Sequence, residues 1–117
     1  MKYVIKLEEL AQTILGIGLL SFLPFQFGWW LWVLLFFSPD IAMLGYVINK
    51  KTGGVTYNIF HHKGIAIAVT ITGFLLKNDT LMLAGVLLFA HASFDRIWGY
   101  GLKYMDDFKH THLGWVK

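Results

Sequence analysis

Two imidazoles and two carboxylates of this sequence have the residue types and the spacing of a metal site. His91 and Asp95 are four residues apart, which places them on one face of a helix. Asp40 follows Pro39, a residue that kinks a helix and exposes backbone carbonyls. Imidazole nitrogens and carboxylate oxygens bind Zn²⁺ and similar ions, and a catalytic zinc keeps about three protein ligands and an open position. We therefore predict a catalytic centre that holds a divalent metal through four residues: Asp40, His61, His91 and Asp95.

Further polar residues near these four are predicted to support the centre: Tyr57, Asn58, Arg96 and His112. The guanidinium of Arg96 could pair with Asp95 or extend to a membrane interface. His112 and His110 would face the same way only in an extended chain. The tail over residues 101–117 is therefore predicted to lie in solvent or against lipid headgroups, with a metal clip as the alternative.

Other charged residues are predicted to have no part in the chemistry. Glu8 and Glu9 stand near the start of an apolar segment, where the helix dipole stabilises solvated carboxylates. His62 and Lys63 are predicted to form an interfacial pair.

Apolar segments that lack charges must position these groups. Only 15% of the 117 residues are charged, against roughly 25% in soluble domains. Residues 10–39 contain no Asp, Glu, Lys or Arg, a stretch too long for one membrane span of about 20 residues. Residues 23–28 carry the Pro and Gly of a turn. The prediction is an all-α, single-domain, polytopic membrane protein with four transmembrane helices in a compact bundle, at about 4–23, 28–48, 55–76 and 80–99, followed by the interfacial tail.

The same features exclude other classes. A soluble globular monomer is disfavoured because a chain this short cannot bury so many apolar residues. The absence of Cys excludes a disulfide-stapled module. The apolar runs are continuous, which disfavours a β-barrel. No phosphate-binding glycine loop and no nucleic-acid motif occurs, so nucleic acid is not expected as a partner.

The basic residues predict an orientation. They gather near the N-terminus, at Lys50 and Lys51, and near the C-terminus, and positive residues favour the cytoplasmic side. Both termini and the loop over residues 49–54, the clearest break in the chain, are thus predicted to be cytoplasmic in the inner membrane. A second break is expected at residues 77–79, where Asn78 or Asp79 caps the next helix. This topology gives all four site residues a similar depth and predicts a shared pocket open to the cytoplasm.

The chain also resembles a known family across nearly its whole length. The blocks that carry the resemblance are Pro39-Asp40 with Met43-Leu44-Gly45-Tyr46, Tyr57-Asn58-x-x-His61, Ala90-His91-x-x-Phe94-Asp95-Arg96-x-x-Gly99-Tyr100-Gly101-Leu102-Lys103-Tyr104, and Phe108-Lys109-x-Thr111-His112-Leu113-Gly114. They are similar to small bacterial integral membrane proteins known only as domain of unknown function 4260. The resemblance implies a compact four-helix membrane protein and supplies no catalytic assignment. A looser resemblance is to membrane-bound metal-dependent hydrolases.

Three functions fit these residues. The first is a metal-dependent membrane hydrolase acting on a lipid-like substrate. The second is a proton-coupled transporter or channel subunit, in which carboxylates and imidazoles form a relay and an oligomer of this chain supplies the missing outer half of the path. The third is a non-catalytic structural or ligand-binding membrane module. Membrane lipid is the expected partner in each case.

Overall fold

Helices make up most of the structure. A computed structural model describes residues 2–98, 101–102, 110–111 and 113–115. Across these residues the elements are α1 (Lys2–Leu20), α2 (Trp29–Phe37), the 3₁₀ helix η1 (Ser38–Val47), α3 (Lys50–His61), α4 (Lys63–Leu75), α5 (Asp79–Ile97) and two antiparallel two-residue strands, β1 (His110–Thr111) and β2 (Gly114–Trp115). The predicted all-α class is confirmed.

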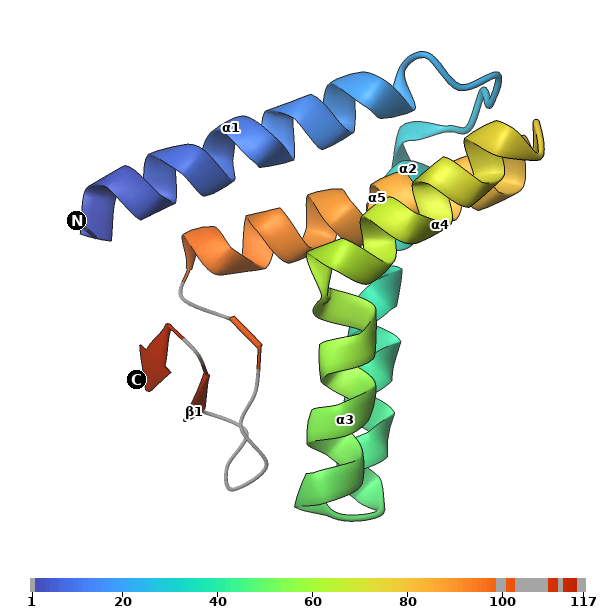
Figure 1. Cartoon of the computed structure of the whole chain (residues 1–117). Helices are drawn as coiled ribbons and strands as arrows, with labels where there is room; N and C mark the ends of the chain where they lie inside the picture. The colour runs from blue at the N-terminus through green and yellow to red at the C-terminus, as the bar shows by residue number, and fades with distance from the viewer. Residues whose placement is uncertain (1, 99–100, 103–109, 112, 116–117) are drawn as a thin grey trace.

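The helices form two groups instead of one four-helix bundle. Helix α5 packs against both α1 and α4 and makes the first group, while α3 packs along η1 and makes the second. The second group projects away from the first, and α3 lies across the direction of α5 (Figure 1). The two groups meet where α2 ends, where α3 ends and at the C-terminal half of α5, so this joint is the place where distant segments converge.

The predicted helix 28–48 changes its type at the proline. The missing N–H of Pro39 removes the hydrogen bond that Leu35 O would accept in an α-helix. Ser38 replaces it, because its hydroxyl donates to Leu35 O at 2.6 Å and its backbone N–H donates to the same oxygen. The chain then continues as the tighter η1. The disturbance that the sequence predicts at Pro39 and Asp40 is therefore a change from α to 3₁₀ geometry.

The predicted helix 55–76 needs correction, because the structure has two helices there. His62 adopts an extended conformation (φ −84°, ψ 115°) and ends α3. Its ring nitrogen Nδ1 then accepts a hydrogen bond from the N–H of Ile65 at 3.2 Å and so caps α4. An imidazole that serves as an N-cap allows the chain to turn without a Pro or Asn, which is why the sequence pattern hides the break.

The predicted break at residues 49–54 is also corrected. Asn49 caps α3 by accepting the N–H of Thr52 at 2.7 Å, so the helix begins at Lys50. Gly53 lies inside α3, where a Cβ atom would lie only 2.2 Å from the Tyr46 ring. The glycine is there because η1 and α3 approach each other closely. The predicted cap at Asn78 is confirmed, since its side chain accepts the N–H of Leu81 at 3.1 Å.

Two helical stretches are long and apolar enough to cross a membrane within the described part of the chain: Trp29–Val47 and Asp79–Ile97. Helix α4 has 13 residues and spans about 20 Å, less than the ~30 Å of a bilayer core. Length and composition of this kind are a weak indication of a membrane location. The four predicted spans are not confirmed.

The close approach of α4 and α5 gives a prediction about stability. A Cβ at Gly85 would lie 2.5 Å from the backbone nitrogen of Thr70, so Gly85→Ala must push the two helices apart. We expect a loss of about 1–2 kcal/mol after the better helix propensity of Ala is included. Thermal unfolding in detergent measures it. Gly18→Ala is the matched control, because nothing lies within 4 Å of its Cβ position; equal midpoints for the two variants would contradict the prediction.

Candidate metal centre

The four predicted site residues come together at the joint between the two helix groups. Asp40 is the third residue of η1, and His61 is the last residue of α3. His91 and Asp95 are one turn apart on α5, and they contact each other as the spacing predicts. One ligand atom from each of the four residues can be chosen so that all lie within 4.8 Å of one another. The structure therefore brings together every residue of the predicted centre.

The nitrogen–oxygen distances are short and similar. His91 Nε2 lies 3.0 Å from Asp40 Oδ1 and 3.1 Å from Asp95 Oδ2. His61 Nε2 lies 3.1 Å from Asp95 Oδ2 and 3.6 Å from Asp40 Oδ1. The two imidazoles are buried, and Asp95 is nearly so. Asp40 differs, since 40% of its side chain is exposed, and it forms the open side of the cluster.

The backbone fixes which nitrogen of each imidazole carries the hydrogen. His91 Nδ1 lies 2.7 Å from the carbonyl oxygen of Phe36, and His61 Nδ1 lies 2.9 Å from that of Tyr57. A carbonyl oxygen only accepts, so each Nδ1 must donate. In the neutral imidazoles both Nε2 atoms then present lone pairs to the carboxylates. The contacts of His61 Nε2 with the carboxylates lack hydrogen-bond geometry, and this buried atom has no hydrogen-bond partner among the described residues.

Four of the six separations among the ligand atoms are close to those around a tetrahedral ion. With Zn–N and Zn–O bonds of about 2.0–2.2 Å, neighbouring ligand atoms of a tetrahedron are roughly 3.3–3.5 Å apart. The four nitrogen–oxygen distances of the cluster, 3.0 to 3.6 Å, bracket that value. The hydrogen bonds from Nδ1 to carbonyl oxygens are those that orient imidazole ligands in metal sites. Asp40, His61, His91 and Asp95 could therefore hold a divalent metal.

Aromatic rings surround the two imidazoles. The Tyr57 ring stacks on His61 with a centroid distance of 3.8 Å and an angle of 6°. The rings of Phe36 and Phe37 pack edge to face with the His91 imidazole, at centroid distances of 5.6 and 6.0 Å. Phe94 packs against both phenylalanines. These rings hold the imidazoles in place and exclude water from one side. Sequence reasoning missed the three phenylalanines, whose only signal was their nearness to Asp40 and Asp95 in the chain.

The other predicted supporting residues have mixed outcomes. Tyr57 contacts the site as described. Arg96 donates from Nη2 to the backbone oxygen of His61 at 3.5 Å, so it lies against the end of α3. Asn58 is half-buried on α3. His112 lies outside the described residues.

The prediction that Glu9 is solvated needs correction. Its side chain is 8% exposed, and Lys63 Nζ donates hydrogen bonds to Glu9 Oε2 and Gln12 Oε1. Lys63, the first residue of α4, thereby reaches α1 with a mostly buried side chain and does not form the expected interfacial pair with His62. The reason is that the turn at His62 directs α4 back along the first helix group, where α1 supplies the countercharge. This pair fixes the start of α4 directly after the site residue His61.

The chain belongs to the family described as domain of unknown function DUF4260, whose model matches residues 2–116. The resemblance noted from the sequence is thus confirmed. Comparisons with curated proteins and with solved structures gave no match.

The buried pair gives a second prediction. Glu9→Ala leaves the Lys63 ammonium buried without its carboxylate, and removing one partner of a buried ion pair costs about 3–5 kcal/mol. Thermal unfolding in detergent should show this loss. Glu8→Ala is the control, because Glu8 is the exposed neighbour on the same helix and its change should stay within about 0.5 kcal/mol. Equal destabilisation by both variants would show that the pair does not hold α4 in place.

Proposed function

We propose that this protein is a membrane protein that binds one divalent transition metal, Zn²⁺ or a similar ion, through Asp40, His61, His91 and Asp95, and hydrolyses a lipid-like substrate there. One observation carries the proposal. Both imidazoles commit Nδ1–H to a backbone carbonyl and direct Nε2 at carboxylate oxygens. Facing acceptors in a buried place are relieved by protons on Nε2, as in the contact of His91 with Asp40, or by a cation between them, and one divalent ion meets all four groups at once.

Surface composition supports the membrane part of the proposal. Only 6% of the apolar stretch in Trp29–Val47 is buried, so this helix is not the core helix of a soluble fold. Large apolar side chains are exposed along it: Trp29, Trp30, Val33, Leu34, Phe37, Ile41, Met43, Leu44 and Val47. A contiguous apolar surface of this extent requires a cover, and lipid provides one. A multi-pass arrangement in the bacterial inner membrane with both termini cytoplasmic belongs to the same proposal and rests on the basic residues.

The open side of the cluster supports the hydrolytic part. Both imidazole ligands are buried and Asp95 is nearly so, while Asp40 is partly exposed and lies where a water molecule and a substrate can approach. A divalent ion held there would supply Lewis acidity and lower the pKa of a water. Asp40 would give up its place on the ion to that water and accept a proton from it, because a catalytic ion keeps about three protein ligands. Hydrolysis adds the hydroxyl to the acyl carbon and the proton to the leaving alcohol.

A second candidate function is a structural clasp. The cluster joins η1 and α3 to α5, so an ion at this position would tie the two helix groups together. Structural zinc sites of four protein ligands contribute directly to folding. The structural clasp and the hydrolytic function share the ion. Removing the ion lowers only the stability of the fold in the first case and abolishes hydrolysis as well in the second.

Metal analysis of detergent-purified protein tests the proposal. We expect about one divalent ion per chain and a loss of that ion in His91→Ala, because His91 contacts both carboxylates. His62→Asn is the matched control, since His62 is exposed and Asn retains an acceptor for capping α4. Equal metal content in the two variants, or none in the wild type, would refute the site. A chelator that lowers the unfolding temperature, in a protein that shows no hydrolysis of lipid esters before the chelator is added, would favour the structural clasp.

The pH dependence of metal affinity is a separate prediction. Each Nε2 must be deprotonated to bind the ion, and a free imidazole titrates near pH ~6.5. Protonation removes the lone pair, so affinity must fall as the pH falls. Two imidazole ligands predict a loss of at least about 100-fold between about pH 7.5 and 5.5, measured by competition with a metal indicator. A site made of carboxylates alone would keep its affinity over this interval.

A further inference from the structure

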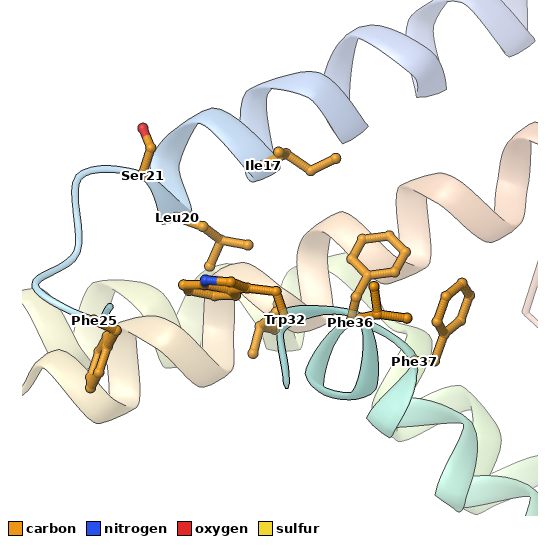
Figure 2. A pocket seen from close by; sticks show the side chains of 9 residues that line it. Ile17, Leu20, Ser21, Phe25, Trp32, Phe36 and Phe37 are labelled. Atoms are coloured by element: carbon orange, nitrogen blue, oxygen red, sulfur yellow. The ribbon is translucent and has the colours of Figure 1, made fainter. Parts of the chain in front are cut away.

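A hydrophobic cavity lies beside the cluster, between α1, α2 and α5. Its volume is about 450 Å³, within the range of small-molecule sites. Figure 2 shows Ile17 and Leu20 on the α1 side, Phe25 in the loop, and Trp32, Phe36 and Phe37 on α2. Ile17 is half exposed, so the cavity opens at the surface of the molecule.

The lining offers few polar partners for a ligand. Ser21 is the single residue with a polar side chain in the lining apart from the Trp32 indole, and its hydroxyl already donates to Gly18 O at 2.5 Å. A ligand that fills this cavity must therefore present hydrocarbon to it. One wall belongs to the apolar stretch Trp29–Val47, whose exposed side lies toward lipid in the proposed function.

The cavity borders the cluster through two phenylalanine rings of α2. The rings of Phe36 and Phe37 line the cavity and also contact the His91 imidazole. Val33 and Phe37 lie one turn apart on the cavity side, and Asp40 follows three residues after Phe37 on the same face. A hydrocarbon chain that lies along Val33 and Phe37 thus reaches Asp40, the exposed member of the cluster, one turn beyond the cavity.

We propose that this cavity holds one hydrocarbon chain of a membrane lipid and that the ester bond of that chain lies at Asp40. The inference rests on the proposed function and names its substrate class, an acyl ester of a membrane lipid. Hydrolysis there consumes one water, which gives its hydroxyl to the acyl carbon and its proton to the alcohol oxygen. The products are a fatty acid and the deacylated lipid, and no oxidant or reductant is needed.

Photolabelling tests the cavity. The full chain in dodecylmaltoside micelles receives a trace of phosphatidylcholine that carries a diazirine in its acyl chain, and labelled residues are mapped by mass spectrometry after illumination. We expect label on Leu20, Trp32 and Phe36. Ile17→Trp fills the cavity and should lower this label about tenfold. Ile14→Trp is the matched control, because Ile14 is an exposed residue of α1 that does not line this cavity, and its label should equal that of the wild type.

Further measurements separate the possible failures. Val33→Trp fills the cavity from α2, so the test stands even if Ile17→Trp does not fold. Label that is absent from the cavity, or that survives both filling variants, overturns the inference. Metal content is measured on the same samples. An unlabelled cavity in protein that holds metal refutes the lipid site alone, whereas a labelled cavity in metal-free protein refutes the metal centre and leaves the chain-binding site in place.

Discussion

The structure depends on one electrostatic constraint at the joint between its helix groups. Two carboxylates and two imidazoles are packed together, with both imidazoles removed from water and Asp95 mostly so. Both imidazoles use their Nδ1–H on backbone carbonyls, so nothing within the cluster neutralises the carboxylates while the rings are uncharged. Burying unpaired charges is very costly. A divalent ion cancels both negative charges and gives every facing lone pair a partner.

The unusual features of the fold serve this joint. The change to 3₁₀ geometry at Ser38 determines where Asp40 lies, and the extended residue His62 ends α3 so that His61 meets α5. Close packing of η1 on α3 at Gly53 keeps these two ends together. The buried pair of Glu9 with Lys63 then fixes α4 immediately after the turn. Each device is local, and together they bring three separate elements to one place.

Much of the candidate site could be predicted from sequence, but its architecture could not. Helical periodicity places His91 and Asp95 together, and the proline marks Asp40. The predicted convergence of all four residues came from an assumed common depth in four straight helices. In the structure it comes from a turn at His62 that has no Pro, and its one glycine, Gly64, lies within the first turn of α4. Glu9 was misjudged for a related reason: its partner is 54 residues away, and only the turned chain brings Lys63 to it.

The uneven burial of the cluster bears on what the ion would do. A clasp that only fastens helices gains from enclosing all of its ligands, because a low dielectric strengthens every ion–ligand contact. Here the three members on α3 and α5 are enclosed, and the member on η1 is open. That open carboxylate follows three residues after Phe37, which lines the neighbouring cavity together with Val33. Exposure of Asp40 weakens a structural role and serves a catalytic one if this carboxylate leaves the ion or the ion takes a fifth ligand, because four protein ligands fill a tetrahedral ion.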